Sequence, residues 1–402
     1  MPVPTATIEA IPGDRAAPAP GNLRPIAVWL LVCCALIFAM VVIGGITRLT
    51  ASGLSITEWQ PVAGALPPLT EADWLAEFDK YRQTAQYQLI NAGMSLASFK
   101  TIYLWEYVHR LWGRLIGAAY ALPLLYFLLR RRVPRRLVLP LAGVLLLGFL
   151  QGALGWYMVT SGLADRVEVS QYRLVAHLAL ALAIYAVMLW TALGLLQSPS
   201  PALRERVARV ARREPGEGDG NGAAARPLAP ALSPGGGEGV FFWWRRAAEA
   251  LLVLIALTIL AGGFVAGLKA GLTYNTFPLM DGSLVPAGYA QLQPFVLNWF
   301  ENVGAVQFDH RLLATATIAA ALIMWAAGQR AALPRPARLA LHALLAAAAL
   351  QFALGVLTLL LVVPIALAAA HQAGAVLLLT AAIVLRHVLR PGRLDLTSAA
   401  SI

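Results

Sequence analysis

Four of the six histidines in this sequence are candidate metal ligands, because they recur in pairs within strongly apolar segments. His109 and His177 fall in one half of the chain, and His310 and His371 fall at matching positions in the other half. Ionisable side chains inside a membrane are costly and usually face the protein interior, where they serve a functional site. Neutral imidazole is a good ligand for haem iron, and two facing histidines give six-coordinate iron. Each pair therefore predicts a haem site.

Zinc and copper fit these residues less well than haem. Each pair offers two strong ligands on different segments, without the cysteine or carboxylate ligands that would complete a tetrahedral site. The two cysteines, Cys33 and Cys34, are adjacent within the first apolar run and predict neither a disulfide nor a metal site. The other histidines, His342 and His387, have no counterpart in the other half, so we expect them to extend towards the membrane interface.

A carboxylate precedes the first histidine of one pair only. Glu106 stands one helical turn before His109, whereas Gln307 stands at the same place before His310. This spacing puts both side chains on one face of a helix. The difference suggests acid, base or charge-stabilising chemistry in the first half and electron transfer alone in the second. The alternative is that Glu106 forms a structural ion pair with Arg110 or Arg48.

Basic residues are expected at the same end of the protein as the histidines. Such residues could pair with the propionates of a haem, which prefer an aqueous edge. The sequence does not distinguish among the candidates, which are Arg48, Lys100, Arg110, Arg114, Arg173, Lys269 and Arg311.

Eight transmembrane helices are predicted to position these residues. Hydrophobic residues make up 59% of the 402-residue sequence and charged residues 13%, which excludes ordinary soluble domains. About 20 apolar residues are needed to cross a hydrocarbon core. Runs of this kind begin near Ile26, Leu111, Leu137, Leu174, Ala247, Leu312, Ala337 and Val363. The sequence therefore predicts an all-α integral membrane protein.

The two halves of the chain repeat one pattern. The first half contains the blocks GGITRLTASGLS, EYVHRLWGR, QGALG and AHLAL, and the second contains GGFVAGLKAGLT, QFDHRLLAT, QFALG and AHQAG in the same order. Because each half holds an even number of spans, the halves share one orientation in the membrane, which is a parallel repeat. We expect two four-helix bundles, formed by residues 25–196 and 240–390.

The remaining segments are predicted to lie outside the bundles. Residues 1–24 are expected to form a disordered N-terminal tail, residues 197–239 a disordered cytoplasmic linker rich in Gly and Pro, and residues 391–402 a cytoplasmic tail. The long outer loop, roughly residues 47–103, is expected to contain an amphipathic helix from Glu71 to Tyr81.

The net charge of +11 is explained by membrane topology rather than by nucleic-acid binding. The arginines gather in the short connections between alternate spans, as is typical of cytoplasmic loops. They do not form the basic stripe with stacking aromatic residues that nucleic acid requires, so we expect no such partner. Both termini are expected in the cytoplasm of a bacterium, with the haem sites towards the periplasmic side of its inner membrane.

Several of these motifs resemble the haem A synthase family. The resemblance lies in GGITRLTASGLSITEWQPVAGALPPL, in FKTIYLWEYVHRLWGR and in the later FDHR and AHQ blocks, and it covers nearly the whole chain. The long first loop without a cysteine pair is similar to the form found in alphaproteobacteria and mitochondria. The resemblance implies oxidation of the C8 methyl group of haem O to a formyl group by successive hydroxylations, which yields haem A for terminal oxidases.

The resemblance also implies roles for individual residues. His109 and His177 would flank the substrate haem, Glu106 would be the catalytic carboxylate, and His310 and His371 would ligate a resident haem b. Haem O synthase and cytochrome oxidase assembly factors would be candidate partners, and a homo-oligomer is a further expectation.

Two other function classes remain open at this point. One is a membrane electron-transfer cytochrome with two permanent bis-histidine haems, in which Glu106 and the long loop would be incidental. The other is a haem carrier, although the sequence lacks the paired broken spans at the membrane midplane that transporters show. The chemical identity of the bound haems distinguishes the three classes.

Overall fold

The computed structural model describes residues 22–58, 64, 66–163, 167–197 and 237–390. The predicted tails 1–24 and 391–402 and the predicted linker 197–239 therefore lie outside the described residues, apart from the short ends at which helices begin or stop. The helices α1 and α11 each have a proline in the first turn. At this position the missing amide proton would have had no hydrogen-bond partner within the helix.

Eight helices are long and apolar enough to cross a membrane, which confirms the predicted number of spans. They supply all the membrane-spanning structure of the described residues. In chain order they are α1 (Arg24–Leu49), α4 (Leu96–Leu129), α5 (Arg135–Leu163), α6 (Gln171–Leu196), α8 (Gly237–Gly267), α10 (Val303–Arg330), α11 (Arg335–Leu360) and α12 (Ile365–Val388).

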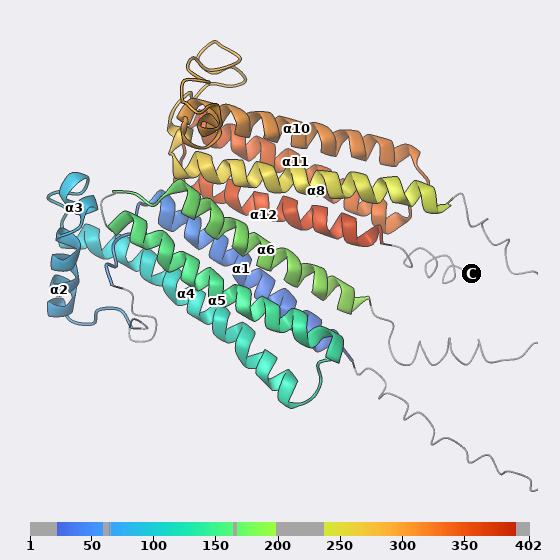
Figure 1. Cartoon of the computed structure of the whole chain (residues 1–402), viewed down its shortest axis with the longest axis horizontal. Helices are drawn as coiled ribbons and strands as arrows, with labels where there is room; N and C mark the ends of the chain where they lie inside the picture. Colours follow the sequence, from blue (N-terminus) through green and yellow to red (C-terminus); the bar gives the residue numbers. More distant parts are fainter. Residues whose placement is uncertain (1–21, 59–63, 65, 164–166, 198–236, 391–402) are drawn as a thin grey trace, which may run out of the picture.

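The eight helices form two groups of four that lie side by side (Figure 1). In the first group, α1 packs against α4 and α6, and α5 packs against α6. In the second, α8 packs against α10 and α12, and α11 packs against α10 and α12. The groups meet through α1 with α12, α8 with α6, and α6 with α12. Because α1 is equivalent to α8 and α6 is equivalent to α12, the contact of α1 with α12 corresponds to the contact of α8 with α6. This is the arrangement expected of a parallel repeat.

The two groups differ in one respect. The helices α10 and α11 pack closely along each other, whereas the equivalent helices α4 and α5 make few contacts. The first group is therefore the more open of the two on that side.

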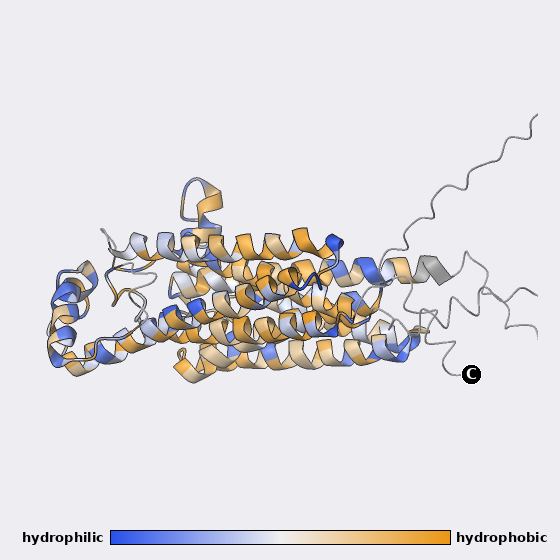
Figure 2. Ribbon diagram, turned by 90° about the horizontal axis from the view of Figure 1, so that it is seen from below, coloured by the Kyte–Doolittle hydropathy of each residue, from blue (hydrophilic) through white to orange (hydrophobic). Residues whose placement is uncertain are grey.

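A continuous apolar core extends through both groups, and Figure 2 shows hydrophobic residues along most of each helix. Polar groups within it are satisfied locally. The hydroxyl of Tyr120 donates to the carbonyl oxygen of Leu141 at 2.8 Å, and Tyr185 on α6 shares a hydrogen bond with Thr380 on α12 at 2.7 Å. The second bond joins the two halves at the centre of their interface.

The connections from α1 to α4 and from α8 to α10 lie at the same end of the protein, which we call the loop end (Figure 1). The first connection contains α2 (Glu71–Arg82) and α3 (Ala85–Leu89), so the predicted amphipathic helix is confirmed. The second contains η2 (Ala270–Leu272), η3 (Phe295–Leu297) and α9 (Asn298–Glu301).

Local capping and a small aromatic core hold the first connection together. Thr70 and Asp73 form a capping box at the start of α2, and the hydrogen bonds from Thr70 hold the pKa of Asp73 below its usual value. Phe78 stacks on Phe99 of α4 with ring centroids 4.9 Å apart, beside the fully buried Tyr81. The connection is thus fixed on the loop end of α4, close to Glu106 and His109.

Candidate functional site

Each of the four predicted histidines lies against a glycine of an adjacent helix. The rings belong to α4, α6, α10 and α12, and the glycines belong to α1, α5, α8 and α11 respectively. A Cβ placed on the glycine would lie 3.3 Å from the His109 ring for Gly44, 3.1 Å from His177 for Gly155, 2.9 Å from His310 for Gly262 and 2.8 Å from His371 for Gly355. Because most of these distances are tighter than normal contacts, the glycines let each ring rest directly on the neighbouring backbone.

The histidines are brought together in the predicted pairs. His109 lies near enough to His177 for their charges to interact, and the same is true of His310 and His371. In the described part of the chain, no cluster of three or more histidine, cysteine or carboxylate groups could hold a metal ion. An iron bound by either pair would therefore need further ligands, and the four nitrogens of a porphyrin supply them. The residues present thus fit a haem.

The pair in the second half contains a ring that is held in one tautomer. Nδ1 of His310 lies 3.1 Å from the carbonyl oxygen of Thr258, so this nitrogen must donate the proton. The lone pair then resides on Nε2, the nitrogen that binds a metal. Such a hydrogen bond from the distal nitrogen fixes the tautomer and orientation of metal-binding histidines.

The pair in the first half is arranged differently. Nε2 of His177 lies 3.1 Å from the amide nitrogen of Gln151, which also donates to the carbonyl oxygen of His177 at 3.1 Å. The lone pair of this ring therefore accepts a hydrogen bond from a protein amide. The sequence did not predict this contact of Gln151. The only signal for it was that the glutamine recurs in the repeated block, as Gln351 of QFALG.

Glu106 is buried, with 2% of its surface exposed, and both of its carboxylate oxygens are engaged. One oxygen accepts hydrogen bonds from Nε and Nη2 of Arg110 at 3.0 and 2.6 Å. The other accepts from the hydroxyl of Ser55 and the backbone amide of Ile56, both at 2.8 Å. The ion pair with Arg110, left open as an alternative by the sequence, is therefore present, whereas Arg48 has other partners.

Gln307 occupies the equivalent position in the second half and likewise accepts from an arginine one turn later, but its other contacts are donated rather than accepted. Its amide donates to the carbonyl oxygens of Ala270 and Thr273, and its oxygen accepts from Arg311 at 3.2 Å. Arg311 in turn donates to the carbonyl oxygen of Tyr274 at 2.6 Å.

The two arginines hold matching loops. Arg110 donates to the carbonyl oxygens of Ile56 and Glu58, and Arg311 donates to those of Tyr274 and Thr276, which are the corresponding residues of the repeat. Each Glu or Gln with its arginine thus fastens the segment that follows the first helix of its half. We call these sets the loop clamps. They differ in charge, since only the first contains a carboxylate.

Two of the other basic candidates meet at the junction of the halves. Arg48 donates to the carbonyl oxygens of Ala266 and Gly267 at 3.2 Å and lies 3.5 Å from the carboxylate of Glu168. Lys269 forms an ion pair with the same carboxylate. These contacts join the loop ends of the two groups.

The remaining basic candidates lie against aromatic rings or a cavity. The ammonium group of Lys100 is 5.3 Å from the ring centroid of Trp74, and the guanidinium group of Arg173 is 3.7 Å from that of Tyr157. Arg114 and Arg110 line a cavity of about 340 Å³ between the first connection and α4. Their role towards propionates stays a prediction.

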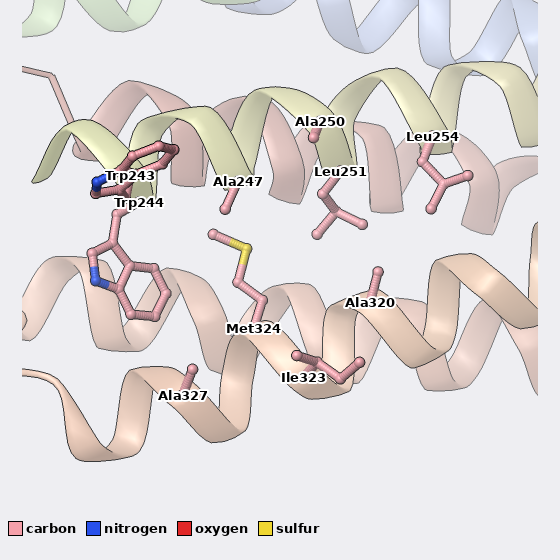
Figure 3. Close-up of a pocket in the computed structure, with 10 residues that line it drawn as sticks. All are labelled: Trp243, Trp244, Ala247, Ala250, Leu251, Leu254, Ala320, Ile323, Met324 and Ala327. Atoms are coloured by element: carbon pink, nitrogen blue, oxygen red, sulfur yellow. The ribbon is translucent and has the colours of Figure 1, made fainter. Parts of the chain in front are cut away.

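A second cavity, of about 510 Å³, lies between α8 and α10 (Figure 3). Its walls are apolar, with Trp243, Trp244, Leu251, Ile323 and Met324 around it, and they contain no histidine or charged side chain. None of the predicted haem-binding residues lines this cavity.

The two excluded histidines lie away from the pairs. His342 is exposed and accepts a hydrogen bond from the indole of Trp325 at 2.9 Å. His387 is only 1% exposed and bonds to Gln197, so the expectation that it extends to the interface is wrong. Partners on α6, including an edge-on contact with Trp190, allow this imidazole to be buried.

Comparison with known proteins agrees with the sequence and the fold. A family model described as cytochrome oxidase assembly protein matches residues 27–214 and 243–383. A haem A synthase of Nitrosospira multiformis is 51% identical, with 91% of this chain and 94% of that protein covered. A haem A synthase of Rhodospirillum centenum is 49% identical, with 94% and 91% covered. On the strength of these near full-length matches, the chain belongs to the haem A synthase family of cytochrome oxidase assembly proteins.

Proposed function

We propose that this protein is a haem A synthase, which oxidises the C8 methyl group of haem O to a formyl group and so produces haem A. Beyond family membership, the proposal rests on one observation. A single repeated scaffold contains two histidine pairs whose surroundings differ in the charge of the loop clamp and in the partners of the imidazoles. Two haems of equal function would give no reason for these differences.

We assign the second pair, His310 and His371, to a resident haem b. The bond from His310 to Thr258 favours a permanent ligand, because the ring is held in the tautomer that binds iron. The helix α11 packs closely on both α10 and α12, which bear this pair. Haem b would supply one-electron transfer. The contact between α6 and α12 puts the helices that bear His177 and His371 next to each other, as electron transfer between the halves requires.

We assign the first pair, His109 and His177, to the substrate. Haem O must enter and haem A must leave, and the sparse packing of α4 against α5 suits a site that exchanges its contents. The imidazole of His177 is held by an amide that iron can displace, rather than by a bond that prepares it for iron.

Glu106 is proposed as the catalytic carboxylate. Four hydrogen bonds fix it in one place, one turn from His109. A fixed charge needs no reorganisation when charge develops during the reaction, which is the most effective form of electrostatic catalysis. The carboxylate would stabilise positive charge at the oxidised methyl carbon or orient the water that attacks it.

The basic residues at the loop end are proposed to neutralise the haem propionates. Arg110 and Arg114 are the best placed of them in the first half, because they share a cavity beside α4. Arg311 holds the corresponding place in the second half.

We propose that the protein lies in the inner membrane of a bacterium with both termini in the cytoplasm. Arg130, Arg131, Arg135, Arg330 and Arg335 lie in or beside the connections at the end opposite the loop end, and excess arginine marks cytoplasmic connections. The haem sites would then face the periplasm. Haem O synthase and oxidase assembly factors are the proposed partners, and self-association is a further proposal.

Conversion of haem O tests this function. Membranes that contain the protein are supplied with haem O, and the haems are then extracted and separated. We expect haem A to form with the intact protein and not with a His177→Ala variant that retains haem b. Unchanged haem O in the presence of a fully haem-loaded protein would favour the electron-transfer cytochrome instead.

A further inference from the structure

One amide in the first half occupies the nitrogen that a haem iron would need. The side chain of Gln151 on α5 bonds to both Nε2 and the carbonyl oxygen of His177 on α6, each at 3.1 Å. With the amide in this position, Oε1 of Gln151 and Nδ1 of His177 are both buried without a hydrogen-bond partner. The amide therefore holds the ring, but it does so in an arrangement that leaves two polar atoms unsatisfied and that a stronger ligand can displace.

The equivalent glutamine in the second half has a different position. Gln351 on α11 directs its amide to Gly374 on α12, where a Cβ atom would overlap with Oε1 of the glutamine. The structure gives no hydrogen bond between this amide and the ring of His371, although both residues are described. The amide thus lies one turn away from the histidine.

A single position of the repeat explains this difference. The blocks AHLAL and AHQAG align, so that Leu180 stands where Gly374 stands in the second half. The side chain of Leu180 packs against the main apolar core. At the equivalent position in the second half, a Cβ on Gly374 would collide with Oε1 of Gln351. Because that space is closed in the first half, the amide of Gln151 turns to His177.

We propose that Gln151 makes His177 an exchangeable haem ligand. Its amide competes with iron for Nε2, so that a haem held by the first pair is released more readily than a haem held by the second. Gln151 is in this sense a positioning residue, which acts through His177, and Leu180 directs it. This role rests on the proposed function, because an enzyme whose substrate and product are both haems must bind and release a haem at each turnover.

The rate at which each haem leaves the full-length protein tests the proposal. The haem-loaded protein is mixed with excess apomyoglobin as acceptor, and the haems that remain bound are extracted and identified over time. The haem at the first pair is recognised by its absence from a His177→Ala variant. Gln151→Met, which removes the amide but keeps the side-chain length, is expected to slow the loss of this haem by about fivefold, the factor of one net hydrogen bond.

Leu180 provides a second test with a matched control. Leu180→Gly should slow the loss of the same haem, because it opens the space that Gln351 uses in the second half. Leu180→Ala removes nearly as much of the leucine but keeps the Cβ atom that blocks this space, so its rate should stay at the wild-type value. Gln351→Met should leave the loss of haem from the second pair unchanged.

Two results would overturn the proposal. Faster or unaltered loss of haem from Gln151→Met would mean that the amide supports ligation or has no influence on it. Equal rates for Leu180→Gly and Leu180→Ala would mean that Leu180 does not direct the amide. The proposed function is tested separately by the identity of the haem that leaves the first pair. If this haem is haem b, the proposed function fails. The comparison of rates still tests the role of Gln151, because it does not depend on which haem is bound.

Discussion

A glycine lies against every one of the four histidine rings, and this contact explains how side chains on four different helices reach matching positions. The glycines are themselves placed by the repeat, since GG of α1 corresponds to GG of α8 and the QGALG block of α5 to QFALG of α11. At these positions a side chain would push the imidazole away from the neighbouring backbone.

Gly355→Ala is expected to lower the haem b content of the purified protein severalfold. The new Cβ would lie 2.8 Å from Cε1 of His371, so the ring must move out of its place opposite His310. Extraction and quantification of haem b measure the effect. Gly148→Ala is the control, because its Cβ would have no atom within 4 Å, and it should retain full haem b. Equal haem b in both variants would refute the role given to the glycine.

Glu106→Gln is expected to fold and bind haem but to convert haem O about 100-fold more slowly, the usual loss when a fixed transition-state contact is removed. Folding should survive because Gln keeps the shape of the side chain, and its oxygen can accept from Arg110 as Gln307 accepts from Arg311. The rate of haem A formation measures the effect, with Glu77→Gln on α2 as the control for loss of a nearby carboxylate. Unchanged conversion by Glu106→Gln would leave Glu106 as a clamp residue only.

Residue type and spacing were enough to predict the histidine pairs and the contrast between Glu106 and Gln307. They were not enough to predict what Glu106 touches. Its partners Ser55 and Ile56 belong to a loop that folds back onto α4, and no periodic pattern records the register of such a loop. The same holds for Gln151, whose amide bonds to His177 on the next helix.

At the scale of elements, the first connection is a small folded unit fixed to the loop end of α4. Its helix α2 was predicted almost to the residue, because its apolar residues recur at helical spacing. The apolar run that begins near Leu111 marks only part of α4, which begins at Leu96. The first turns of α4 pack on α2, so hydropathy alone could not reveal where the helix begins.

Phe78→Ala is expected to destabilise this unit by about 3–5 kcal/mol, the usual cost of removing a buried aromatic side chain. Phe78 is 2% exposed and stacks on Phe99, whereas the transmembrane core has its own separate contacts. Amide hydrogen exchange should therefore quicken in α2 and α3 and stay unchanged in α8 to α12. Exchange that quickens equally throughout would mean that the connection and the helices unfold as one unit.

At the scale of the whole molecule, duplication supplied one scaffold and local substitutions gave its halves different properties. Hydropathy and the repeated blocks predicted the eight spans and their parallel relation, since both follow from the length and order of apolar segments. The looser packing of α4 against α5 could not be predicted in this way, because it depends on side-chain fit between helices. This openness, together with the charge of Glu106, is what separates the proposed substrate half from the proposed cofactor half.

The central claim is that the two histidine pairs hold chemically different haems, and the pigments extracted from three purified proteins test it most directly. The wild-type protein should yield haem b together with haem O or haem A. His371→Ala should lose haem b and keep the other haem, and His177→Ala should show the opposite loss. Two equivalents of haem b from the wild-type protein, with one equivalent lost in each variant, would contradict the account.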